Sequence, residues 1–97
     1  MKPSELLDKN RQAIHDAIKR FNAANPRVLG SVARGEDHPG SDIDILVDAL
    51  PGSTLFTLGG LQYELEQMFE GIEVDLVTPG DLPKAIRSRV LSEAKLL

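Results

Sequence analysis

Apolar residues recur at helical spacing in three segments of the chain. The first covers residues 3–24 and is expected to end where Asn25-Pro26 interrupts the helix. The second covers residues 61–71, and the third covers about residues 81–96. The regular stripe in the first segment predicts a helix that packs one side against a hydrophobic core.

Three shorter segments have the composition or the alternation of a β-strand, namely residues 27–29, 43–47 and 72–77. Residues 31–41 indicate a loop with a short helical turn, and residues 51–60 a mobile connection, because both contain glycine and proline. The order helix, strand, strand, helix, strand, helix is typical of an α+β or α/β protein and has too few strands for a barrel.

The composition narrows the classes of protein to consider. Of the 97 residues, 41% are hydrophobic and 27% are charged, which predicts one soluble globular domain over residues 1–97. A net charge of −4 and only three phenylalanines and one tyrosine disfavour binding to nucleic acid through phosphates or stacked bases. No cysteine is present, and no segment resembles a signal peptide or a membrane span. We therefore expect a cytoplasmic protein with no membrane or direct nucleic-acid contact.

Three aspartates lie in the predicted strands. Asp42 and Asp44 are two residues apart, so their side chains point to the same side of a strand while Ile43 and Ile45 point to the core. Two close carboxylates repel unless a cation lies between them, and oxygen ligands favour Mg²⁺ or Mn²⁺. If the two strands pair, Asp75 from the other strand could join them. The alternative is that the first two aspartates line the solvent face of an edge strand.

The segment before these aspartates has features that suit a polyphosphate. Gly30 allows close backbone approach, Ser31 offers a hydroxyl and an N–H group, and Arg34 offers a charged fork. A P-loop is rejected, because Glu36 and Asp37 stand where that motif requires Lys and Ser or Thr. An ordinary strand-to-helix turn remains the simpler interpretation of the glycine–serine pair.

Other polar residues are weaker candidates for a chemical role. His38 is interpreted as an exposed loop histidine, and His15 as a surface or partly buried side chain of the first helix. Arg87 and Arg89 could approach phosphates or an acidic partner, although a solvated basic face is favoured.

The combined pattern Gly30-Ser31-x-x-Arg34-Gly35, followed by Ser41-Asp42-x-Asp44 and an apolar run, resembles the signature of the DNA polymerase β-like nucleotidyltransferase superfamily. More narrowly, the chain is similar to the minimal nucleotidyltransferase (MNT) proteins. These are small antitoxin partners of HEPN-domain ribonucleases in bacterial and archaeal toxin–antitoxin pairs. The resemblance implies the nucleotidyltransferase fold, a small mixed β-sheet with helices mainly on one face and the carboxylates on the open face.

The resemblance also implies a metal site. Asp42 and Asp44 would coordinate two Mg²⁺ ions, with Mn²⁺ as an alternative cation. Asp75 would hold the catalytic ion and help to deprotonate the acceptor hydroxyl.

A nucleotide site is implied by the same comparison. Gly30 and Ser31 would bind the β- and γ-phosphates of ATP with the help of Arg34, and Ser41 would brace the turn into the catalytic strand. Leu29 departs from the family, whose members often have an aromatic residue before the Gly-Ser pair. This change affects packing and leaves the expected chemistry intact.

The function implied by the family is transfer of AMP from ATP to a tyrosine of a HEPN ribonuclease toxin, which silences that toxin. Two alternatives remain open. In the first, the protein is a non-catalytic antitoxin that masks its partner through apolar residues of the last helix, which ends in Leu96-Leu97. In the second, the nucleotide is transferred to a small molecule such as an aminoglycoside.

Overall fold

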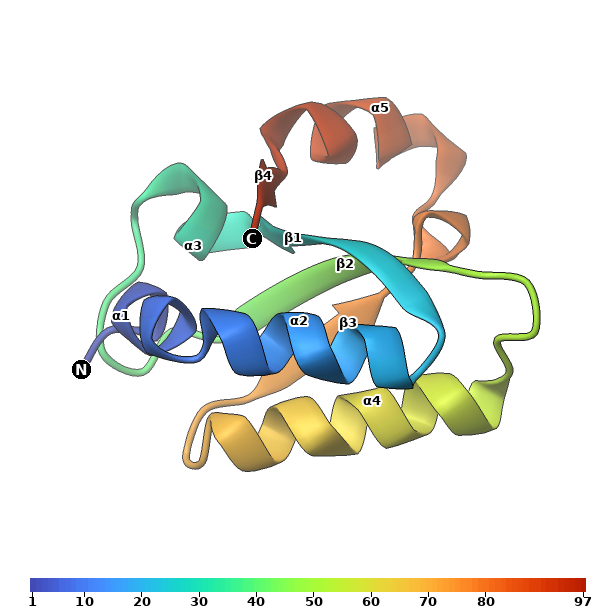
Figure 1. The fold of residues 1–97 in the computed structure, drawn as a ribbon. Coiled ribbons are helices and arrows are strands. Elements are labelled where there is room, and N and C mark those ends of the chain that lie inside the picture. The colour runs from blue at the N-terminus through green and yellow to red at the C-terminus, as the bar shows by residue number, and fades with distance from the viewer.

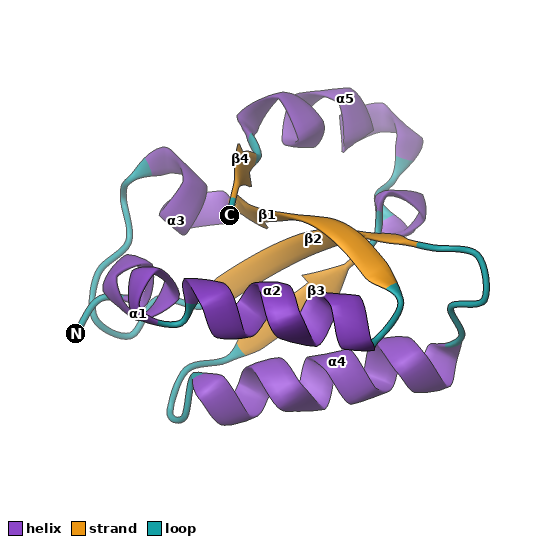
Figure 2. Cartoon of the chain, in the orientation of Figure 1, coloured by secondary structure: helices purple, strands orange, loops and turns teal.

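The computed structural model describes residues 1–97 and contains a mixed four-stranded sheet flanked by helices (Figures 1 and 2). The elements in chain order are α1 (Pro3–Lys9), α2 (Arg11–Arg20), β1 (Ala23–Leu29), α3 (Gly30–Arg34), β2 (Ile43–Ala49), α4 (Leu55–Met68), β3 (Val74–Val77), the 3₁₀ turn η1 (Pro79–Asp81), α5 (Lys84–Glu93) and β4 (Lys95–Leu96). The strand order is β3-β2-β1-β4, in which β2 and β3 are parallel and the other two pairs are antiparallel. The predicted fold class is therefore confirmed.

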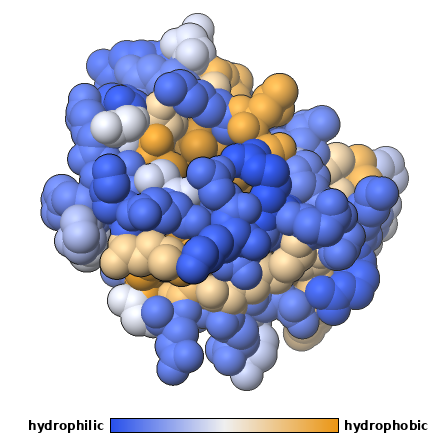
Figure 3. Space-filling view, turned by 60° about the vertical axis from the view of Figure 1, so that its left-hand side comes forward, coloured by the Kyte–Doolittle hydropathy of each residue, from blue (hydrophilic) through white to orange (hydrophobic).

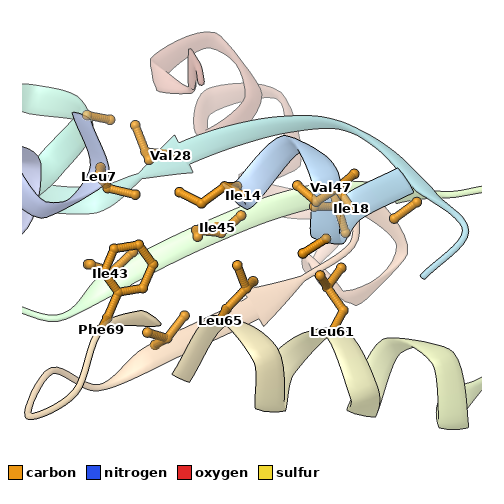
Figure 4. Packing of buried hydrophobic residues seen from close by; sticks show 14 residues of the cluster. Leu7, Ile14, Ile18, Val28, Ile43, Ile45, Val47, Leu61, Leu65 and Phe69 are labelled. Carbon is orange, nitrogen blue, oxygen red and sulfur yellow. The ribbon is translucent and has the colours of Figure 1, made fainter. Parts of the chain in front are cut away.

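The hydrophobic core lies between the sheet and the pair of helices α2 and α4, which run along one face of it (Figure 4). From the central strand β2, Ile43, Ile45 and Val47 point into this core and are completely buried. Side chains at helical spacing cover them, namely Ile14 and Ile18 from α2 and Leu61, Leu65 and Phe69 from α4 and the residue that follows it. The alternation in β2 thus anchors the strand through its odd-numbered residues.

The opposite face of the sheet is only partly open. Because Ile43, Ile45 and Val47 face the core, Asp44 and Leu46 project to the other side, where Leu46 is nevertheless fully buried. In Figure 1, α5 lies on this side of the sheet, away from α2 and α4. The positions of α2 and α4 agree with the prediction of helices mainly on one face. On the opposite face, where Asp44 projects, α5 covers part of the sheet.

The N-terminal helix was predicted too long. The chain breaks at Asn10 between α1 and α2, and β1 already begins at Ala23. Asn22 and Asn25 adopt positive φ angles of 60° and 53°, a conformation that asparagine tolerates better than most residues. They allow a sharp turn into the strand and a register shift around Pro26, so this proline lies within β1 and does not precede it.

Residues 51–60 were wrongly predicted to be only a mobile connection. Helix α4 begins at Leu55, where Thr54 caps it by accepting a hydrogen bond from the Thr57 N–H at 3.2 Å. Gly60 is required inside this helix, because a Cβ there would lie 2.6 Å from Cε1 of Phe21. Gly60, which in the sequence indicates a loop, in fact allows α4 to pack closely against Phe21.

The C-terminal segment also differs from the expectation. The predicted strand 72–77 begins only at Val74, and the predicted helix 81–96 is divided into η1, α5 and the short strand β4. Pro83 precedes α5, and β4 pairs with β1 through Lys95 and Leu96. Residues that were expected to end a helix therefore complete the edge of the sheet.

Apolar side chains also reach the surface. In Figure 3 a group of apolar atoms stands among hydrophilic ones near the top of the molecule, the level of α5 and β4 in Figure 1. The exposed large residues of these two elements are Ile86, Leu91 and Leu96. No helix combines the length and the apolar character needed to cross a membrane.

Candidate active site

The turn from β1 into α3 brings the glycine of the motif against the first strand aspartate. Gly30 follows β1 directly and has a φ angle of 65°, which favours glycine. A Cβ at this position would lie only 2.8 Å from Oδ2 of Asp44. Two residues that are 14 apart in sequence are therefore in contact, and the lack of a side chain at Gly30 makes the room for the carboxylate.

Strand pairing places a second carboxylate beside Asp44. In the parallel pair of β2 and β3, Asp44 is in register with Asp75, and in the antiparallel pair with β1 it is in register with Leu29. Residues in register on neighbouring strands project to the same face, so the two acidic side chains are neighbours. Asp42 comes just before β2 and is exposed.

The electrostatics of the site show the cost of this arrangement. Burial raises the pKa of Asp44, and the negative charge of Asp75 raises it further, with smaller contributions from Asp42 and Glu73. The folded protein thus holds Asp44 where its ionised form is disfavoured, and groups perturbed in this way cluster at functional sites.

These carboxylates can take part in binding a divalent cation but do not form a finished metal cage. No group of three or more His, Cys, Asp or Glu side chains is arranged to hold a metal ion by itself. Asp44 and Asp75 nevertheless supply paired oxygen donors of the type that Mg²⁺ prefers, and Mg²⁺ commonly takes further ligands from water and phosphate. The residues present therefore fit a cation that shares its coordination with a bound nucleotide.

The other motif residues, Ser31, Arg34 and Ser41, differ in the contacts that they make within the protein. Ser31 lies in the first turn of α3, and no hydrogen bond occupies its hydroxyl within the protein. Arg34 donates from Nε to Glu36 Oε2 at 3.2 Å, and its Nη1 lies 3.9 Å from Glu93 Oε2. Ser41 accepts a hydrogen bond from the His38 N–H at 3.0 Å, so it closes the turn that leads into β2.

A cavity of about 370 Å³ opens beside Asp44 on the face narrowed by α5. Its nine lining residues come from both sides of the gap: Leu29, Gly30, Arg34, Asp44, Val77, Leu82, Arg89, Val90 and Glu93. The sequence motif therefore supplies only some of the residues that line this cavity, namely Gly30, Arg34 and Asp44. The apolar residues of α5 carried a helical pattern in the sequence, but the side of the sheet that they would cover could not be inferred from it.

Among the weaker candidates, only Arg89 lines this cavity. His38 is exposed, as expected, with its ring Nδ1 3.0 Å from the carbonyl of Pro39. His15 is partly buried and its Nε2 lies 2.9 Å from the Leu97 carbonyl. Arg87 is not part of a solvated basic face, because it is partly buried and donates to the Leu82 carbonyl at 2.8 Å.

Comparison with known proteins identifies the family of this chain. The model of the nucleotidyltransferase domain family matches residues 11–97. A Methanocaldococcus jannaschii protein that is provisionally named a protein adenylyltransferase is 43% identical over 88 residues, or 91% of this chain and 94% of that protein. The protein adenylyltransferase MntA of Thermococcus cleftensis is 39% identical over 75 residues, or 77% of this chain and 75% of that protein.

Two solved structures have the same fold. One, provisionally described as a minimal nucleotidyltransferase, has a TM-score of 0.84 at 39% identity and covers 97% of this chain and 95% of its own. The other, a toxin–antitoxin crystal structure with AMP-PNP, has a TM-score of 0.72 at 24% identity and covers 90% and 71%. This chain therefore belongs to the nucleotidyltransferase domain family. Within that family it is of the minimal nucleotidyltransferase type, as the sequence motif predicted.

Proposed function

We propose that this nucleotidyltransferase transfers AMP from ATP to a hydroxyl group of a partner protein. The observation that carries the proposal is the contact of Gly30 with Asp44 together with the register pairing of Asp44 and Asp75. The names of the two relatives, both protein adenylyltransferases, support adenylyl transfer, and the toxin–antitoxin structure with AMP-PNP supports ATP as the donor.

In this reaction the acceptor oxygen attacks the α-phosphorus of ATP, and the bond from that phosphorus to the bridging oxygen breaks, so that pyrophosphate leaves. Asp75 accepts the proton that the acceptor hydroxyl loses as its oxygen bonds to the α-phosphorus. Gly30 and Ser31 hold the β- and γ-phosphates, and Arg34 adds positive charge on the same side. Asp42, Asp44 and Asp75 would hold a divalent cation. In our proposal this cation is Mg²⁺, and the complete site binds two such ions. The cation would neutralise charge on the phosphates.

The acceptor that we propose is a tyrosine on a HEPN ribonuclease toxin, with this protein as the antitoxin. A protein acceptor is consistent with the exposed apolar residues Ile86, Leu91 and Leu96, because α5 also borders the cavity next to Asp44. The same surface supports a second candidate function, in which the antitoxin neutralises its partner by binding alone.

Labelled ATP distinguishes these functions. With Mg²⁺ and the protein encoded by the neighbouring gene, label from the α-phosphate should appear on that protein, whereas label from the γ-phosphate should not. Asp42→Asn combined with Asp44→Asn should abolish transfer, while Asp16→Asn on the exposed side of α2 serves as the matched control. No transfer from either label would contradict adenylyl transfer.

The outcome of neutralisation separates catalysis from masking. If the double variant still neutralises the toxin in cells, binding alone is sufficient and the second function is correct. Transfer of the α-label to an aminoglycoside, with none to the neighbouring protein, would instead identify a small-molecule acceptor.

A further inference from the structure

The first turns of α4 carry large apolar side chains that the protein leaves in solvent. Leu55 is 88% exposed, Phe56 is 91% exposed and Tyr63, two turns further along, is 64% exposed. The core side of the same helix is already filled by Leu61 and Leu65, which are fully buried. Large apolar side chains that are grouped on the surface of a protein commonly mark an interaction site.

The segment of the chain that leads up to Tyr63 carries no charge, and the first charged residue after it is Glu64, which pairs with Arg20 at 3.1 Å. No Asp, Glu, Lys or Arg occurs from Ala49 to Tyr63, although 27% of all residues are charged and the net charge is −4. Two copies of an acidic protein repel each other when like-charged surfaces meet. In a symmetric dimer the same patch meets itself, so an uncharged patch avoids that repulsion.

We propose that α4 forms a two-fold interface with α4 of a second copy of this chain. Phe56, Gly59 and Tyr63 follow one another at intervals of three and four residues, so they lie on one stripe of the helix. A two-fold axis that crosses the helix between Gly59 and Gly60 places Phe56 of each copy opposite Tyr63 of the other. A Cβ at Gly59 would meet nothing within 4 Å, so this side of the helix is open to a second backbone.

The size of the patch predicts a weak dimer. A buried aromatic side chain removes about 150–250 Å² from water, so Phe56 and Tyr63 together contribute on the order of 400 Å² per copy. A standard interface buries about 800 Å² per partner. We therefore expect association at micromolar concentrations or above, and not the nanomolar affinity of an obligate dimer.

This interface would leave the candidate active site accessible. Asp44 lies near the start of β2, whereas α4 begins after the end of that strand, at the opposite end of the sheet from α3 in Figure 1. Two copies joined through α4 would therefore keep both cavities facing outward, each available to its own acceptor protein.

Sedimentation velocity from about 5 to 500 µM tests the proposal. The unmodified chain should show a concentration-dependent monomer–dimer equilibrium, and Phe56→Glu should weaken it at least tenfold, because each dimer would then contain two buried charges. Ala13→Glu, which adds the same charge at an exposed apolar position of α2, is the matched control and should leave the equilibrium unchanged. A monomer at all concentrations, or equal weakening by both variants, would overturn the proposal.

Cysteine cross-linking tests the register of the two helices. The chain has no native cysteine, so Phe56→Cys and Tyr63→Cys can be made as separate single variants and mixed under oxidising conditions. A 56–63 disulfide should form faster than the 56–56 or 63–63 disulfide, because only residues whose Cα atoms lie within about 7 Å can be bridged. Equal rates for the three pairs would refute this geometry.

A different occupant would give a different result. If the protein from the neighbouring gene covers the patch, the unmodified chain alone stays monomeric and Phe56→Glu prevents co-purification of the two proteins, which refutes the second-copy proposal. Circular dichroism should show unchanged folding of Phe56→Glu, because the side chain is almost wholly in solvent.

Discussion

Replacing Asp44 by Asn should make the protein more stable at neutral pH while it removes activity. Asp44 lies in register with Asp75, and neighbouring strands are about 4.8 Å apart. Two unit charges at that distance repel by about 1 kcal/mol in water and by about 3.5 kcal/mol at an effective dielectric constant of 20. Because Asp44 is only partly buried, we expect Asp44→Asn to raise the free energy of unfolding by about 1–2 kcal/mol.

The pH dependence gives this prediction a direction. The pKa of Asp44 is raised above its ordinary value of 3.8, first by burial and then by Asp75. A carboxyl group with a raised pKa favours folding below its unfolded pKa, and this contribution is lost as the pH rises through the folded pKa. The stability difference between Asp44→Asn and the unmodified chain should therefore be largest near pH 7 and should close as the pH falls towards 3.8.

Thermal unfolding followed by circular dichroism in EDTA measures the effect. In a domain of this size about 1 kcal/mol corresponds to a shift of about 4–8 °C in Tm. Mg²⁺ should then raise the Tm of the unmodified chain more than that of Asp44→Asn, and Asp16→Asn serves as the control for loss of a surface charge. If Asp44→Asn is less stable than the unmodified chain at pH 7, the carboxylates do not repel each other as argued.

Three further substitutions test other contacts. Gly30→Ala should cost about 1–2 kcal/mol and displace the Asp44 carboxylate, so urea unfolding and adenylyl transfer should both be impaired. Gln62→Leu should cost about 1–3 kcal/mol in urea unfolding, because Gln62 bonds the Val74 carbonyl and the Leu76 N–H at the free edge of β3. Asp37→Asn should destabilise at pH 7 but not far below pH 3.8, because the hydrogen bond from the Ser4 N–H lowers the pKa of Asp37.

The candidate site residues were predicted from a local sequence motif. Such a motif indicates the spacing of residues along one segment but not the contacts between different strands. The spacing of Asp42 and Asp44 predicted that they share one side of a strand, but in the structure β2 begins only at Ile43, directly after Asp42. The contact of Gly30 with Asp44 and the pairing with Asp75 depend on strand order, which the sequence left open. Those two relationships became visible only once β2 was found at the centre of the sheet.

Two of the incorrect element boundaries share a physical cause. Glycine and proline favour loops locally, but at Gly60 and Pro26 tertiary contacts override this preference. Gly60 lies within α4 because Phe21 occupies the space beside it, and Pro26 lies within β1 because the register shifts there. Neither contact changes the spacing of the apolar residues, so the hydrophobic pattern could not reveal the correct boundaries.

The active site and the hydrophobic core depend on the same strand register. In β2, the buried residues Ile43 and Ile45 fix the face on which Asp44 must appear, because a slip of one residue would exchange the two faces. Burying the Asp44 carboxylate in the core would cost far more than its repulsion by Asp75 on the outer face. The apolar residues therefore do more than stabilise the sheet: they exclude the registers in which the acidic pair could not meet Gly30 and a nucleotide.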